Sequence, residues 1–127
     1  MDLKTATNFE LNKRLSELMG YVVWNLTLPS GKIITVMRKT YESDVCKIPL
    51  KDYCNSWADM GPVIEELDIS LIRDVQSDNS WMAVPSICFK FGGFDSMFDI
   101  HHHDTNPLRA AVIVAIQVLG QRADETL

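Results

Sequence analysis

The sequence predicts an α+β fold, in which an antiparallel sheet built from hairpins has helices packed on it. Three observations predict this fold class. Apolar residues recur at helical spacing near both ends and in the middle of the chain. The two stretches between them are rich in β-branched and aromatic residues, and turn-forming residues divide each stretch into two strands. The predicted order is α-ββ-α-ββ-α, and helices on both faces of the sheet would make it α/β/α sandwich-like.

A capping box predicts where the first helix begins. Thr7 is a good N-cap residue, and Glu10 stands three residues later, so we expect a helix over residues 8–19. The following residues predict a β-hairpin, with Gly31 offering the positive φ that its turn requires. The two strands of this hairpin are residues 21–28 and 33–38.

The second helix and hairpin follow a weakly patterned connection over residues 39–51. Asn55 or Ser56 caps the second helix, which runs to Leu67 and contains Pro62, a residue that shortens the first turn or leaves a kink. The strands of the second hairpin are residues 69–75 and 81–89. Pro85 marks a bulge or a sheet edge in the second of them.

The last helix has a clear beginning at Asn106-Pro107 and runs to about Gln121. It is apolar nearly all round, so it either lies at the centre of the fold or packs against a second copy of the chain. We expect a homo-oligomer for this reason. The preceding residues 90–105 are the least regular, which makes them a candidate for function, for mobility or for one extra short strand.

Length and composition limit the class of protein. The 127 residues suit one domain, 1–127, with frayed ends at about 1–6 and 123–127. The net charge of -5 disfavours general nucleic-acid binding, because an acidic surface repels phosphates. The first residues do not resemble a signal peptide, and the longest apolar stretch is too short to span a membrane. The three cysteines, an odd number, fit reduced thiols in a cytosol.

The run of three histidines is the most conspicuous feature. On a strand, His101 and His103 point to the same side and could share a zinc ion, with Asp104 as an oxygen ligand. A zinc site needs three or four ligands, and only this short segment offers them, so a polar loop is favoured over a metal site. We expect no cofactor, with zinc as the alternative.

Two further segments carry groups that could bind a ligand. The start of the last helix offers free N–H groups and the Arg109 guanidinium to an anion, with an ordinary helix cap as the alternative. Trp57 could stack on a base beside polar groups, or it could simply pack on the core. The predicted ligand-binding residues are Asn55, Ser56, Trp57, Asp59, Asn106 and Arg109.

Nothing local to the sequence predicts nucleophilic catalysis. No signature marks any cysteine, and the adjacent Glu65 and Glu66 diverge on a helix. Gly92-Gly93 alone does not indicate phosphate binding. The sequence therefore favours a protein that is not an enzyme and leaves the question open.

The sequence resembles the NinX-like family of lambdoid phages and prophages, a domain of unknown function. Residues 52–66, DYCNSWADMGPVIEE, resemble the family's D-x-C-N-N-P-A-D-A-W-P-I-I stretch. Residues 106–114, NPLRAAVIV, are similar to its N-P-L-R-A-A-M-I-V helix. Ser56-Trp57 replaces the family's Asn-Pro, and Gly61 stands where a tryptophan is common, so fine ligand specificity does not carry over.

The resemblance implies an accessory bacteriophage protein in the cytoplasm of a host bacterium. We expect non-catalytic binding, in counter-defence or host takeover, that captures a small anionic, nucleotide-like ligand or a host protein. Two alternatives stay open: a metal-assisted hydrolase that uses His101–Asp104, and a structural scaffold that dimerises through the last helix.

Overall fold

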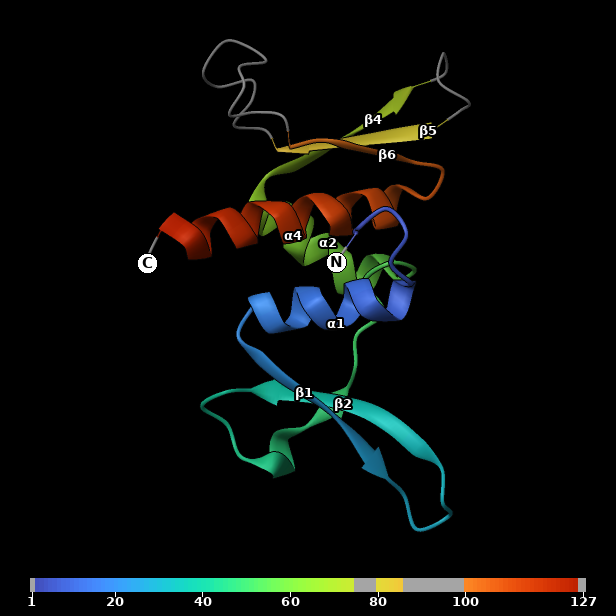
Figure 1. The fold of residues 1–127 in the computed structure, drawn as a ribbon, viewed down its shortest axis with the longest axis vertical. Helices are drawn as coiled ribbons and strands as arrows, with labels where there is room; N and C mark the ends of the chain where they lie inside the picture. Colours follow the sequence, from blue (N-terminus) through green and yellow to red (C-terminus); the bar gives the residue numbers. More distant parts are fainter. Residues whose placement is uncertain (1, 75–79, 86–99, 126–127) are drawn as a thin grey trace.

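The computed structural model describes residues 2–74, 80–85 and 100–125 and places a layer of helices between two antiparallel sheets (Figure 1). The helices are α1 (Asn8–Leu18), α2 (Trp57–Leu67) and α4 (Pro107–Glu125). The strands are β1 (Tyr21–Thr27), β2 (Ile33–Lys39), β3 (Ile48–Pro49), β4 (Ile69–Asp74), β5 (Ser80–Pro85) and β6 (His102–Asp104). A short 3₁₀ turn, η1 (Asp44–Cys46), precedes β3.

The α+β class and the alternation of helices and hairpins are confirmed, but the layers differ from an α/β/α sandwich. The strands form two separate three-stranded sheets, in the orders β1-β2-β3 and β4-β5-β6. The helices lie between these sheets rather than outside one sheet (Figure 1). This arrangement follows from α4, because a helix that is apolar nearly all round needs to be covered on more than one side.

Local sequence signals account for the first helix and hairpin. The Thr7 hydroxyl accepts a hydrogen bond from the Glu10 N–H at 3.1 Å, and the Glu10 carboxylate accepts one from the Thr7 N–H at 3.2 Å. Both halves of the predicted capping box are therefore present. Gly31 adopts a φ of +88° in the hairpin turn, as its position predicted. All seven residues of β1 pair with β2.

The second helix begins where Ser56 accepts a hydrogen bond from the Asp59 N–H at 3.3 Å. Pro62 lies inside the helix and does not end it. Asp68 ends it instead, in the left-handed region at a φ of 59°, and β4 follows directly. Of the second predicted hairpin, residues 86–89 lie outside the described part of the chain, whereas the suggested extra strand is present as β6.

The core is centred on α4. Its residues 110–116 are all buried, and they join one hydrophobic cluster with Leu11 and Leu15 of α1 and Met60 and Val63 of α2. The β4–β6 sheet covers the other side, where Ala83 of β5 is fully buried. The chain thus buries this helix by itself, which removes the reason for a dimer through α4. Along the described chain, no helix meets the length and hydropathy of a membrane span.

A buried polar side chain connects α1 with the segment before α2. Asn12 is 6% exposed, donates a hydrogen bond to Asp52 Oδ1 at 3.1 Å and accepts one from the Cys54 N–H at 3.2 Å. Asn106, at the start of α4, donates to the Cys54 carbonyl at 2.8 Å. Both backbone groups of the buried Cys54 are therefore satisfied by asparagines from two other elements.

Replacing Asn12 with alanine should destabilise the fold by about 1–3 kcal/mol, because the buried Cys54 N–H loses its acceptor. Urea denaturation followed by circular dichroism measures this loss. Asn55→Ala is the matched control, since exposed Asn55 also donates to Asp52 and its loss should change stability by less than about 0.5 kcal/mol. Equal effects of the two substitutions would contradict the assigned role of Asn12.

Candidate functional site

The start of α4 is capped by its own side chains. Asn106 accepts hydrogen bonds from the N–H groups of Leu108 at 2.9 Å and Arg109 at 3.4 Å, and its own N–H donates to Asp104 Oδ1 at 2.9 Å. The N–H groups that sequence reasoning offered to an anion thus already have an acceptor. The structure supports an ordinary cap at Asn106, the alternative that the sequence left open.

Arg109 holds the N-terminal segment against α4. Its guanidinium donates to the carbonyl of Ala6 at 2.6 Å, to the carbonyl of Lys4 at 3.3 Å and to Asn8 Oδ1. It also forms an ion pair with Asp104 at 3.3 Å, and its side chain is 16% exposed. The sequence predicted that Arg109 recognises a phosphate. In the structure, the N–H groups of its guanidinium instead bond to groups of the protein itself. Residues 2–6, expected to be frayed, are held in place by these bonds.

The polar side chains of the second predicted segment, residues 55–59, also form hydrogen bonds within the protein. Ser56 caps α2, Asp59 accepts a hydrogen bond from the Asp52 N–H at 3.1 Å, and Asn55 donates to the Asp52 carboxylate. Trp57 is 57% exposed, so its indole does not pack in the core as the alternative interpretation expected. Asn106 brings this segment next to the start of α4, and the polar groups at the junction bond to one another.

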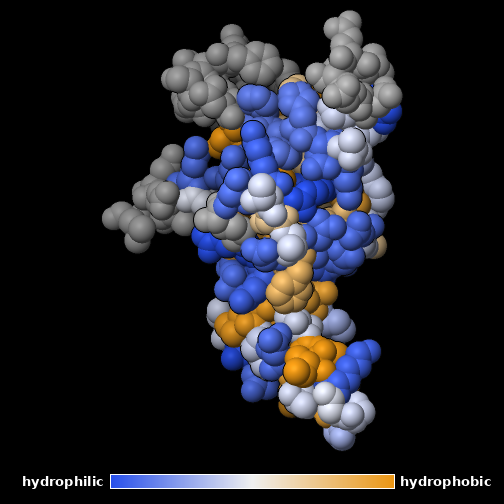
Figure 2. Space-filling model, turned by 45° about the vertical axis from the view of Figure 1, so that its right-hand side comes forward, coloured by the Kyte–Doolittle hydropathy of each residue, from blue (hydrophilic) through white to orange (hydrophobic). Residues whose placement is uncertain are grey.

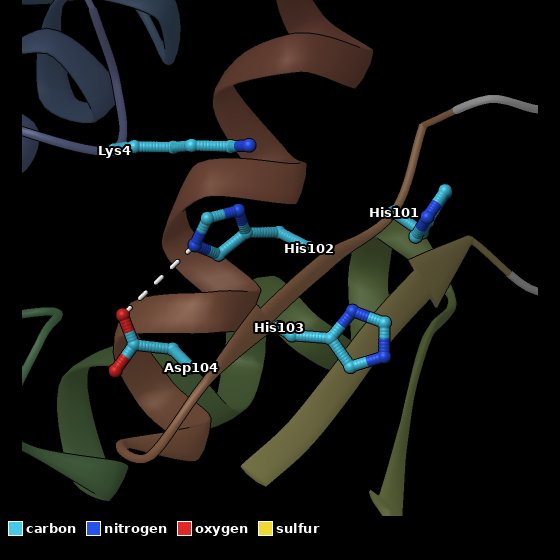
Figure 3. A pocket seen from close by; sticks show the side chains of 5 residues that line it. All are labelled: Lys4, His101, His102, His103 and Asp104. Atoms are coloured by element: carbon cyan, nitrogen blue, oxygen red, sulfur yellow. Dashed lines mark ion pairs between the residues drawn. The ribbon is translucent and has the colours of Figure 1, made fainter. Parts of the chain in front are cut away.

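The histidine run begins one residue before β6, and its side chains divide between two sides of the chain. The rings of His101 and His103 lie 5.9 Å apart, edge to face, whereas His102 lies on the side of Asp104, with 3.9 Å between Nε2 and Oδ2 (Figure 3). Asp104 therefore does not complete the predicted zinc set, because neighbouring strand residues point to opposite sides. In residues 2–74, 80–85 and 100–125, no three His, Cys, Asp or Glu side chains are grouped to hold a metal.

These residues line a hollow beside the N-terminal segment. It has a volume of about 360 Å³ and is lined by Lys4, His101, His102, His103 and Asp104 (Figure 3). The side chain of Lys4 lies next to that of His102 (Figure 3). On the side of β6 that faces Lys4, the lining thus combines one ammonium and the His102 imidazole with a single carboxylate, which already pairs with Arg109, while His101 and His103 lie on the other side of the strand. Such a surplus of donors suits a small anion.

Burial changes the chemistry of two groups near the hollow. It lowers the pKa of His102 below its usual 6.5, although the Asp104 carboxylate acts in the opposite direction. Burial also raises the pKa of the Cys54 thiol to about 11, against the opposing effect of Arg109. Cys54 is therefore a protonated thiol at neutral pH and a poor nucleophile.

Sequence reasoning missed two residues of the hollow, Lys4 and His102. Lys4 was placed in a frayed end, and no local signal shows that Arg109 fixes the backbone beside it. His102 was set aside because it alternates with His101 and His103 on a strand. Of the irregular segment that the sequence offered as a candidate for function, residues 90–105, residues 90–99 lie outside the described part of the chain.

Replacing Arg109 with alanine should lower the free energy of unfolding by about 2–3 kcal/mol, since several charge-assisted hydrogen bonds are lost together. Guanidinium denaturation measures the change. Arg14→Ala removes the same side chain from an exposed position of α1 and should cost less than about 0.5 kcal/mol. Wild-type stability of the Arg109 variant would show that the guanidinium does not hold the N-terminal segment.

Acidification should destabilise the protein through His102. Below pH 6.5 and above the lowered folded-state pKa, the unfolded chain binds more protons, so stability falls as the pH falls. In His102→Gln, the Tm should therefore drop less than in the wild type between about pH 7.5 and pH 5.5. Exposed His101 supplies the control, His101→Gln, which should keep the wild-type drop. An unchanged pH profile in His102→Gln would refute the assignment.

Compared with family models and with curated proteins, the chain matches none of them. The likeness of residues 52–66 and 106–114 to the NinX-like family therefore stays a prediction from the sequence. The function proposed next rests on the geometry of this chain.

Proposed function

We propose that this protein binds a small anionic ligand, of nucleotide-like chemistry, without transforming it. The binding site is the hollow lined by Lys4, the three histidines and Asp104. The observation that carries the proposal is the surplus of cationic and neutral donors over a single carboxylate that Arg109 already pairs. A phosphate group accepts hydrogen bonds from ammonium and imidazole groups, and charge makes these bonds stronger than neutral ones.

The size of the hollow supports a small ligand. Its volume of about 360 Å³ lies near the lower end of the range for small-molecule sites, roughly 300–1,000 Å³. Lys4 and β6 come from opposite ends of the chain, and a ligand between them would stabilise the folded state by binding both.

Capture rather than catalysis is supported by the state of the nearby groups. The Cys54 thiol is protonated at neutral pH because its pKa is raised to about 11. Asp104 serves as the acceptor for Asn106 and Arg109, which keeps it from acting as a free general base. A metal-assisted hydrolase would require a third ligand beside His101 and His103.

The biological setting belongs to the proposal as well. We infer an accessory bacteriophage protein that acts in the host cytoplasm, in counter-defence or host takeover, by keeping its ligand from host enzymes. This setting rests on the sequence resemblance of residues 52–66 and 106–114 alone. Capture of a host protein in place of a small ligand is the alternative that the experiment below separates.

Titration calorimetry with inorganic phosphate, adenosine monophosphate and ADP-ribose tests the proposal. At least one of them should bind with saturable heat, and binding should tighten as the pH falls, because protonated imidazoles attract an anion more strongly. Lys4→Glu should weaken binding about tenfold or more, since it reverses the one ammonium of the hollow.

Lys13→Glu is the matched control, because it makes the same charge change at an exposed position of α1. It should bind as the wild type does. No heat from any of the three probes, or equal weakening by both substitutions, would reject the hollow as an anion site and favour a protein target.

A further inference from the structure

The outer edge of β1 carries backbone groups that point away from the sheet. Hydrogen bonds from the Leu28 N–H to the Lys32 carbonyl and from the Thr40 N–H to the Gly20 carbonyl fix the pairing with β2. Even-numbered residues of β1 therefore bond to β2, and odd-numbered ones face outward. The outward groups belong to Tyr21, Val23, Asn25 and Thr27, and no described residue bonds to them.

The other described sheet edges carry features that block strand pairing, and β1 carries none. β3 has two residues, one of them Pro49, and β6 has three residues that include a carboxylate. β4 ends in the charged pair Arg73-Asp74. By contrast, β1 has seven residues, no charge, no proline and no bulge in its register. A long, regular, uncharged edge is a template for another strand.

The β1–β3 sheet also exposes apolar side chains. Of the eight large hydrophobic residues that are exposed in the described chain, five lie between residues 22 and 48: Val22, Ile33, Tyr41, Val45 and Ile48. Figure 2 shows hydrophobic colour gathered at the end of the molecule that this sheet forms. Of these five residues, only Val22 lies in β1 itself, whereas Ile33 lies in β2 and Ile48 in β3, so this apolar surface belongs to the sheet as a whole.

We propose that β1 pairs antiparallel with β1 of a second copy of this chain, so that two three-stranded sheets become one sheet of six strands. The pairing is self-complementary. With Trp24 on the two-fold axis, Val23 lies opposite Asn25 of the second copy, and Tyr21 lies opposite Thr27. All four residues present outward N–H and C=O groups, so each pair exchanges two hydrogen bonds.

Charge favours a second copy as the occupant. The seam itself brings no charged residue against another, because β1 has none. Antiparallel pairing brings the hairpin turn of one copy, with Lys32, to the end of the joined sheet that lies next to the last turn of α1 of the other copy, which contains Glu17. Among the described residues, neither Lys32 nor Glu17 has an ion-pair partner in its own chain. Opposite charges attract when they come within a screening length of roughly 8 Å.

The ammonium of Lys39 lies at the same end of the sheet as Tyr21, and an aromatic ring of its own chain already stabilises its charge. Its Nζ lies 4.1 Å from the centre of the Tyr21 ring, where a cation is stabilised by the aromatic face.

The surface area that a dimer requires is modest, because a stable interface covers roughly 800 Å² of each partner. That is about a tenth of the 7802 Å² that one chain exposes.

Amide hydrogen exchange of the unmodified protein tests the proposal without any substitution. At concentrations where sedimentation velocity finds a dimer, the amides of Tyr21, Val23, Asn25 and Thr27 should become protected. On dilution they should exchange freely, whereas the amides of Val22, Trp24 and Leu26 stay protected by β2 at every concentration. A monomer at all accessible concentrations, or a dimer that leaves the odd-numbered amides unprotected, would overturn the proposal.

A matched pair of substitutions at Asn25 tests the same seam. Asn25→Pro removes an outward N–H from each copy and should weaken the dimer at least about tenfold. Asn25→Ala removes the same side chain, whose Oδ1 accepts a hydrogen bond from Thr35, but keeps the N–H and should dimerise as the wild type does. Circular dichroism verifies that both fold. If the two variants dimerise equally, the interface lies elsewhere.

Charge reversal separates a second copy from any other occupant of the edge. Lys32→Glu alone should weaken the dimer about threefold, in line with the small energies of exposed ion pairs. Adding Glu17→Lys should restore it, because the attraction between copies returns with its sign reversed. If dimerisation ignores both changes, Lys32 and Glu17 do not meet across the two-fold axis and this register is excluded.

Discussion

The guanidinium of Arg109 is the constraint on which the candidate site depends. One planar group donates to the carbonyls of Lys4 and Ala6, contacts Asn8 and pairs with Asp104. It therefore joins the N-terminal segment, α1, β6 and α4 at one point. A guanidinium suits this role because its donors lie in a fixed fork and its charge persists at all relevant pH values. The hollow exists because this group holds Lys4 beside the histidines.

The two proposed binding surfaces are separated by the helical layer. The hollow lies against β6, whereas β1 belongs to the sheet on the other side of the helices (Figure 1). Pairing of two copies along β1 would therefore leave both hollows accessible, and the dimer would carry two equivalent ligand sites. The two surfaces would also bind through different interactions. The hollow offers ammonium and imidazole groups, and the strand offers backbone hydrogen bonds and apolar side chains.

Features encoded by neighbouring residues were predictable, and features that join distant residues were not. The capping box of Thr7 and Glu10, the turn at Gly31 and the start of α4 depend on residues within a few positions of each other, and all three were found where expected. Three partners of Arg109, at Lys4, Ala6 and Asn8, lie more than a hundred positions away, so no spacing rule reveals them. Periodicity likewise shows which face of a strand is buried, but not whether two hairpins share one sheet.

The position of α4 has a consequence for the order in which the protein folds. The helix around which the core is packed is the last described element of the chain, and its residues 110–116 supply the surface that α1, α2 and β5 bury. During synthesis the earlier elements emerge without the helix that they pack against. Their apolar faces stay uncovered until α4 leaves the ribosome. The hydrogen bond between Arg109 and the Ala6 carbonyl then closes a loop of about a hundred residues. Folding of this chain is therefore late and cooperative rather than progressive from the N-terminus.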